Sequence, residues 1–200
     1  WPTCGSSASA SSAAGKSVTI GGADGRQRSL RYDRLVLAAG SLGAKPDIPG
    51  LAKYGFTVDQ LDDAIALDHH LHALANRPSS AARDTAVVCG GGFTGIEVAT
   101  ERPSRLRAIL APKANVRVLI VDRNEAIAPA MGPHPRPLIE KALGEAGVET
   151  RLGVGVSALS ESGVTLSDGQ SIESATVIWA GGFRASPLTA APATARACRR

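Results

Sequence analysis

The stretch TAVVCGGGFTGIEVATE, residues 85–101, decides the fold. Its first five residues form an apolar run with the length of a buried strand, and its last six residues have the composition of a helix. Gly90, Gly92 and Gly95 stand between them with GxGxxG spacing, in the strand–loop–helix order that a dinucleotide-binding loop requires. Gly90 permits the tight turn, Gly92 lets a diphosphate approach the backbone, and Gly95 lets the helix pack against the strand. The stretch therefore predicts a βαβ nucleotide-binding unit.

The same unit predicts where the rest of the nucleotide lies. Free N–H groups and the dipole at a helix N-terminus favour a negatively charged ligand, so we expect the diphosphate there. A second apolar strand, residues 116–121, leads to Asp122, whose carboxylate can accept hydrogen bonds from ribose hydroxyls and would repel a 2′-phosphate. The repulsion by Asp122 favours NADH as the ligand. The neighbouring Arg123 could attract a 2′-phosphate, so NADPH stays the less favoured alternative. The expected contact residues are Gly90, Gly91, Gly92, Phe93, Thr94, Gly95, Asp122 and Arg123.

Two stretches of the chain, residues 18–41 and 164–182, share one layout. Each contains a short hairpin with an Asp-Gly turn, followed by an apolar strand that ends in small residues. Small residues at a strand end let another molecule approach the backbone closely. Either stretch alone indicates an ordinary hairpin, but both in the same order indicate a duplicated unit. The small residues are Ala38, Ala39, Gly40 and Ser41 in the first stretch and Gly181 and Gly182 in the second.

Helical periodicity predicts two more helices, at residues 59–74 and 137–146. The first places leucines 67, 71 and 74 on one stripe and has Asp59 as its expected N-cap. The second has Gly147 just beyond its end. Pro103 is expected to break or restart the helix that follows the glycine loop, because proline lacks the backbone N–H that a helix interior needs.

The composition excludes several classes of protein. The 44% hydrophobic and 20% charged residues are typical of a globular chain, and no apolar run approaches the roughly 20 residues of a membrane span. The net charge of +4 comes from scattered residues and the aromatic content is only 4%, so we expect no nucleic-acid partner. His69 and His72 lack a third ligand, and the three cysteines form no CxxC pair, so we expect no metal site.

These features together resemble the pyridine nucleotide-disulfide oxidoreductase superfamily, and most closely its type II NADH dehydrogenases. The resemblance covers roughly residues 17–188 and implies an α/β fold with Rossmann-like FAD- and NAD(P)-binding domains. In that fold, a three-stranded antiparallel meander forms the crossover of a parallel sheet. The stretches that carry the resemblance are YDRLVLAAGS (32–41), AVVCGGGFTGIEVATE (86–101), VRVLIVDR (116–123) and ATVIWAGGFRASPL (175–188).

The resemblance also implies a domain organisation and a second cofactor. Residues 51–182 would form the NAD(P)H-binding domain, with Gly181-Gly182 at its strand end. Residues 17–50 and 183–200 would be remnants of an FAD-binding domain, preceded by a low-complexity start at residues 1–16. Residues 38–41 would lie against FAD. The glycine loop of the FAD domain and its C-terminal Gly-Asp segment have no match, so the chain is expected to be a fragment.

The implied activity is hydride transfer from NADH to FAD, followed by electron transfer to a small-molecule acceptor, for which quinone is expected. Glu97 matches the family's glutamate at the nicotinamide, although a glutamate in a first helical turn can also merely stabilise the helix dipole. Two alternatives stay open: a non-catalytic NAD(H)-binding module without a complete flavin site, and a ferredoxin-linked reductase. The expected location is the cytoplasm, with peripheral contact at the inner face of the membrane.

Overall fold

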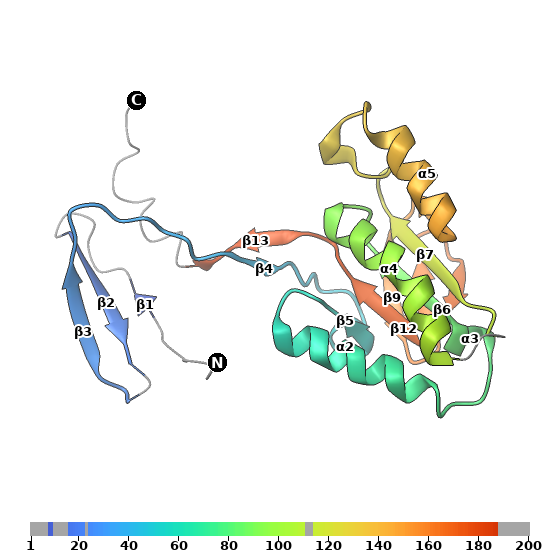
Figure 1. Ribbon diagram of the computed structural model, residues 1–200, viewed down its shortest axis with the longest axis horizontal. Helices are drawn as coiled ribbons and strands as arrows, with labels where there is room; N and C mark the ends of the chain where they lie inside the picture. The colour runs from blue at the N-terminus through green and yellow to red at the C-terminus, as the bar shows by residue number, and fades with distance from the viewer. Residues whose placement is uncertain (1–7, 10–15, 23, 111–113, 188–200) are drawn as a thin grey trace. The chain divides into compact units, whose positions relative to one another are not determined.

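The computed structural model describes residues 8–9, 16–22, 24–110 and 114–187 (Figure 1). The chain forms two compact units. One unit is continuous and comprises Gly43–Gly182, and the other combines Trp1–Leu42 with Phe183–Arg200. The continuous unit ends where the predicted domain 51–182 ends but begins eight residues earlier, and the domain assignment stays a prediction.

The continuous unit is built on a five-stranded parallel sheet. Its strand order is β5-β12-β6-β7-β8, and every neighbouring pair is parallel. The central strands are rich in β-branched apolar residues and buried on both faces, as in other sheets covered on two sides. The strands are β5 (Gly55–Phe56), β12 (Thr176–Trp179), β6 (Thr85–Cys89), β7 (Arg117–Asp122) and β8 (Val148–Leu152).

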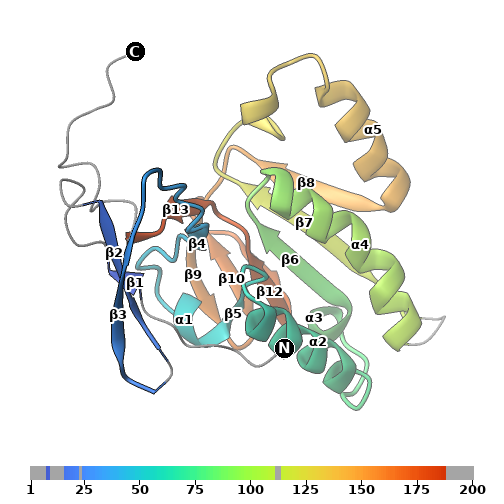
Figure 2. The same cartoon turned by 60° about the vertical axis from the view of Figure 1, so that its left-hand side comes forward.

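Helices cover one face of this sheet and a small antiparallel sheet covers the other (Figure 2). The helical layer is made by α2 (Leu61–Leu74), α4 (Phe93–Leu110) and α5 (Arg136–Ala146). Alternate strand residues serve the two layers: Ala86 and Val88 pack with the helices, whereas Val87 and Cys89 pack with the antiparallel strands. The parallel sheet therefore separates two hydrophobic cores, one beneath the helices and one beneath the antiparallel strands.

The antiparallel layer is a meander with strand order β11-β10-β9. It joins β8 to β12, which lies beside β6 in the sheet, so it forms the predicted three-stranded crossover. The predicted α/β fold with its parallel sheet and meander is confirmed. The meander strands are β9 (Val156–Ser160), β10 (Gly163–Leu166) and β11 (Ser171–Glu173), and the short helices of this unit are α1 (Leu51–Tyr54), α3 (Ala81–Asp84) and the 3₁₀ turn Pro129–Met131.

The discontinuous unit contains the first of the two predicted hairpins. Strands β2 (Ser17–Gly21) and β3 (Gln27–Arg31) pair antiparallel, and β1 (Ala8–Ser9) extends them. Strands β4 (Ser41–Gly43) and β13 (Phe183–Ala185) form a separate two-stranded sheet. The prediction of an apolar strand at residues 35–41 is wrong for residues 35–40, which form no strand. No described strand pairs with this run, so its backbone has no ladder of hydrogen bonds to hold it extended. Its leucine and valine side chains are exposed.

The helix predictions are confirmed with two corrections. Leucines 67, 71 and 74 are buried as expected, and Gly147 caps α5 in the left-handed region at φ 74°. The expected N-cap Asp59 is wrong, because α2 begins after Gln60 and no side chain caps it. The expected break at Pro103 is also wrong, since α4 continues through this residue to Leu110.

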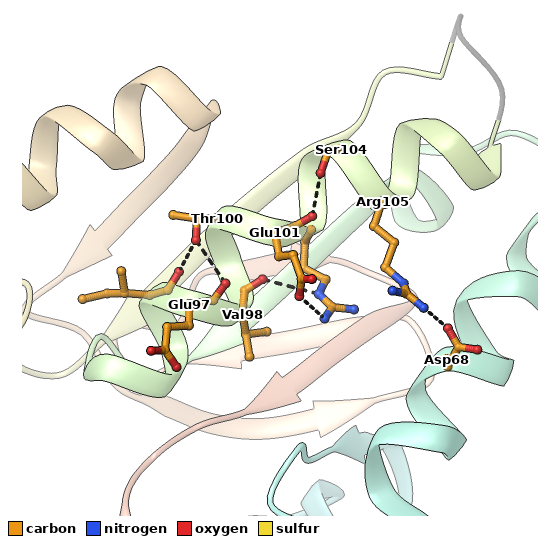
Figure 3. A network of polar contacts seen from close by, with 9 residues as sticks. Asp68, Glu97, Val98, Thr100, Glu101, Ser104 and Arg105 are labelled. Carbon is orange, nitrogen blue, oxygen red and sulfur yellow. Dashed lines mark hydrogen bonds and ion pairs between the residues drawn. The ribbon is translucent and has the colours of Figure 1, made fainter. Parts of the chain in front are cut away.

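Side-chain donors bond to backbone carbonyls of α4 in the turns before Pro103 (Figure 3). They do not replace the bond lost at the proline, which lacks the N–H that would donate to Ala99 O four residues earlier. Thr100 Oγ1 donates to Ile96 O and to Glu97 O, and the Nε of the buried Arg102 donates to Val98 O. Pro103 is itself buried, so packing of its ring adds to these bonds.

His70 ties α2 to the sheet. Its Nε2 lies 3.0 Å from Thr176 Oγ1, and its ring lies 4.4 Å, centroid to centroid, from Phe56. Burial, and to a smaller extent the charge of Arg77, lowers the pKa of His70 from its ordinary value of 6.5. The folded chain therefore resists protonation of this imidazole more than the unfolded chain does.

This lowered pKa predicts acid sensitivity. The unfolded chain takes up a proton near the ordinary value of 6.5, whereas the folded chain resists protonation. The free energy of unfolding should be fully retained above that pH and should fall as the pH drops below it. Urea denaturation at pH about 7.5 and about 5.5 measures the fall, and His70→Gln should reduce it. The same change at the exposed His72 is the matched control. If the free energy of unfolding fell equally in wild type and in His70→Gln between these two pH values, the prediction would be contradicted.

Candidate functional site

The three glycines of the loop have three different surroundings. Gly90 has φ +123°, and a Cβ there would lie 2.4 Å from Ala180 O, so the turn accepts only glycine. A Cβ on Gly95 would lie 1.8 Å from Gly90 O, which shows how closely α4 packs against the loop. A Cβ on Gly92 would meet no atom within 4 Å. The loop is therefore tight at its two ends and open at its centre.

The open centre coincides with the N-terminus of α4. In a helix that begins at Phe93, the first N–H groups have no acceptor within the helix and favour an anionic partner. Gly92 and Phe93 are exposed, and the Phe93 side chain retains 57% of its accessible surface. Thr94 is half-buried and Gly95 is buried. No described side chain lies within 4 Å of the position that a Cβ on Gly92 would take, so the backbone there is open to a ligand.

The Asp122 carboxylate is directed at the glycine loop. The Gly91 N–H donates to Asp122 Oδ2, while Asn124 donates to Oδ1 through its backbone N–H and through Nδ2, each at 2.7 Å. The Gly91 carbonyl in turn accepts from Ala128 N at 2.9 Å. Arg123 is exposed, and no described carboxylate pairs with its guanidinium. A ligand on Asp122 would therefore lie beside the glycine loop.

The second predicted strand end lies next to this loop. Ala180 N donates to Cys89 O at 2.8 Å, which places Gly181 and Gly182 at the same edge of the sheet as Gly90. Gly182 has φ +110° and its carbonyl accepts from Ala44 N at 2.8 Å. A Cβ on Gly181 would overlap the Trp179 ring, whose Nε1 donates to Ala44 O. The small residues at this strand end therefore lie next to the glycine loop.

The other small-residue segment belongs to the discontinuous unit. Ala38, Gly40 and Ser41 are exposed, Ala39 is half-buried, and Gly40 has φ +63°. Residues 38–41 are therefore accessible, and their contact with a flavin stays a prediction.

Glu97 lies in the first turns of α4 with an exposed carboxylate (Figure 3). Its carbonyl accepts from Thr100 Oγ1 at 3.0 Å, but no described residue bonds to its carboxylate. Farther along the helix, an ion pair between Arg105 and Asp68 joins α4 to α2. The helix that carries Glu97 is thus fixed in place while the carboxylate stays open to a ligand.

Sequence reasoning missed Asn124, which is the main partner of Asp122. The signal was present: Asp-x-Asn is the pattern of a turn in which an Asp side chain accepts from the backbone two residues on. Sequence reasoning also missed Ala128, whose N–H donates to Gly91 O from a residue with φ +48°. No sequence pattern marks that contact.

The remaining features that could carry chemistry are a buried cysteine before the loop and a cavity at the other end of the sheet. Burial raises the pKa of the Cys89 thiol to about 12, so this cysteine is not a thiolate nucleophile at neutral pH. A cavity of about 310 Å³ lies at the opposite, amino end of β12, next to His70 and Ala175. Within residues 8–9, 16–22, 24–110 and 114–187 there is no group of three metal-ligating side chains, and no helix is long and apolar enough to cross a membrane.

Comparisons with known proteins agree with this geometry. The sequence profile of the pyridine nucleotide-disulphide oxidoreductase family matches residues 5–198. An NADH dehydrogenase-like protein of Mycobacterium tuberculosis is 50% identical over 180 residues, which are 86% of this chain and 45% of that protein. The type II NADH:quinone oxidoreductase NdhA of the same organism is 30% identical over 174 residues, covering 78% of this chain and 37% of that protein.

Solved structures show the same fold. NDH2 of Plasmodium falciparum in complex with NADH superposes with a TM-score of 0.70 at 17% identity, over 90% of this chain and 41% of that one. An NAD-dependent persulfide reductase from A. fulgidus gives a TM-score of 0.68 at 26% identity, over 90% and 31%. The chain spans less than half the length of these relatives. The matched profile covers nearly all of its residues, so the predicted family is confirmed: the chain belongs to the pyridine nucleotide-disulphide oxidoreductases.

Proposed function

We propose that this chain supplies the NADH-binding part of an FAD-dependent, NADH dehydrogenase-like oxidoreductase. One observation carries the proposal: the glycine loop is open at Gly92, and the Asp122 carboxylate is directed at the same loop. Relatives named NADH dehydrogenase-like and type II NADH:quinone oxidoreductase support it.

Each part of the nucleotide would have its own contacts. The amides at residues 92–95 would hold the diphosphate, and Asp122 would accept from the adenosine ribose. The exposed Glu97 carboxylate would accept from the nicotinamide carboxamide, and the small residues 181–182 would let the nicotinamide ring lie against the backbone. When bound, NADH supplies a hydride that reduces FAD. The role of the chain is to bind and orient the nucleotide.

NADH is preferred to NADPH in this proposal because a 2′-phosphate would meet the Asp122 carboxylate. The nearby Arg123 has no described acidic partner, so it offers the one local attraction for a phosphate. NADPH is therefore the weaker ligand.

Within residues 17–200, the proposed domains differ from the two compact units only at residues 43–50, which belong to the continuous unit. Residues 51–182 would be the NAD(P)H-binding domain, and residues 17–50 and 183–200 would belong to an FAD-binding domain, with residues 38–41 against the flavin. The electron acceptor of the whole protein would be quinone, as the names of the type II relatives indicate, and the protein would work from the cytoplasmic face of the membrane through peripheral contact.

NADH should stabilise the purified chain. A ligand that binds only the folded state at about 100 times its dissociation constant adds roughly 2.7 kcal/mol to the free energy of unfolding, which raises Tm by several degrees. Thermal unfolding with and without NADH measures the shift, with NADPH as the comparison.

A second measurement separates the proposal from its alternative. NADH should bleach the flavin absorbance of the whole protein. NADH binding by a whole protein without flavin would favour a non-catalytic NAD(H)-binding module. The absence of any NADH-dependent shift in Tm would reject both functions.

A further inference from the structure

We propose that Asn124 is a positioning residue that orients the Asp122 carboxylate and so sets the preference for NADH over NADPH. This inference rests on the proposed function and deepens it. Asn124 would not contact the nucleotide itself. It would act through the carboxylate that does.

The first step is the occupancy of Asp122 Oδ1. Asn124 donates to this oxygen twice at 2.7 Å, once from its backbone N–H and once from Nδ2. A carboxylate oxygen has two lone pairs, and two donors fill them. Oδ1 is therefore committed to Asn124 and faces away from any ligand.

The second step concerns the lone pair that Asp122 Oδ2 still has free to accept a hydrogen bond from a ligand. This oxygen accepts from the Gly91 N–H, which leaves one lone pair for a ribose hydroxyl. Bonds to both oxygens also prevent the carboxylate from rotating. A 2′-phosphate would thus face a negative charge that cannot swing away, and NADPH is disfavoured.

The third step is that the turn is held independently of the Asn124 side chain. Asn124 O accepts from Gly153 N at 2.9 Å, and Asp122 O accepts from Val154 N at 3.1 Å. Gly155 N donates to Ser167 Oγ at 3.0 Å, which fastens this segment to the residues that follow β10. Removing the Asn124 side chain should therefore take away one bond to Asp122 and leave the turn in place.

The test is the nucleotide preference of Asn124→Ala, measured by calorimetric titration of the chain with NADH and with NADPH. The backbone N–H of residue 124 and the Gly91 N–H still hold the carboxylate in this variant, so its looser orientation should weaken NADH binding by up to about tenfold. NADPH binding should change less, because a carboxylate held by two donors instead of three has more freedom to turn from the phosphate, so the affinity ratio of the two nucleotides falls. Asn124→Ser, which keeps a hydroxyl donor, should restore part of the ratio. Asn76→Ala, at an exposed asparagine beyond α2, should leave it unchanged.

A readout without nucleotide completes the test. The Gly91 amide proton should exchange with solvent faster in Asn124→Ala than in wild type, because its acceptor is held by one hydrogen bond fewer. An equal loss of affinity for NADH and NADPH in the variant would overturn the inference. So would an unchanged affinity ratio together with an unchanged exchange rate of the Gly91 amide proton. Either result would leave the proposed function intact. Failure of the wild-type chain to bind NADH at all would reject the proposed function, and the selectivity role of Asn124 with it.

Discussion

Gly95→Ala is expected to lower the free energy of unfolding by about 3 kcal/mol, the upper range for overpacking a tightly packed site. The added Cβ would lie 1.8 Å from Gly90 O and 2.9 Å from the Gly90 carbonyl carbon. These are backbone atoms, which cannot turn aside as a side chain would. Helix α4 would have to move away from the glycine loop, and urea denaturation measures the cost.

Gly92→Ala is the matched control, because it adds the same methyl group three residues away. No atom lies within 4 Å of the new Cβ, so the free energy of unfolding should stay within about 1 kcal/mol of wild type, the usual cost of a neutral change. The methyl would occupy the open space over the loop, so NADH affinity should fall at least tenfold. A Gly95→Ala chain as stable as wild type, or a Gly92→Ala chain that binds NADH normally, would contradict this account of the loop.

Asp122→Ala should have the largest effect on nucleotide binding, a loss of roughly 10- to 100-fold in NADH affinity, since a hydrogen bond to a charged group contributes about 1.5–3 kcal/mol. The variant removes the acceptor for the ribose. It also leaves Gly91 N and both Asn124 donors without their acceptor, which loosens the loop. Calorimetric titration with NADH measures the loss.

Two further variants make this result specific. Asp122→Asn keeps the size of the side chain but removes its charge, so the preference for NADH over NADPH should shrink. Asp168→Ala removes an exposed carboxylate whose ion-pair partner is Arg151, and it should leave NADH affinity unchanged. Equal NADH affinity in wild type and Asp122→Ala would exclude Asp122 from the site.

The sequence predicted the fold best where local pattern and tertiary contacts agree. The apolar run at residues 85–89 is buried on both faces, so its composition alone identified a central strand. The run at residues 35–40 has a similar composition but forms no strand, because pairing depends on neighbours that a local pattern does not contain. Pro103 shows the converse, since α4 continues through it and buries its ring, so packing outweighs a local helix-breaking signal.

The candidate site could be predicted in outline from the sequence. Glycine spacing located the loop, and the strand end located Asp122, because both depend on residues close in sequence. The approach of residues 180–181 to Gly90 was not predicted, because it joins residues about ninety positions apart in the sequence. Asn124 and Ala128 were missed, since their importance lies in which atoms they bond to.

The bond between Ala44 N and Gly182 O has a consequence for the architecture of the chain. It brings the two ends of the continuous unit, Gly43–Gly182, next to each other. A segment whose ends meet can be inserted into a host loop at little cost in closure entropy, and its own core stays uninterrupted. Residues 43–182 are thus a transplantable module, suited to excision, to circular permutation or to exchange between host proteins.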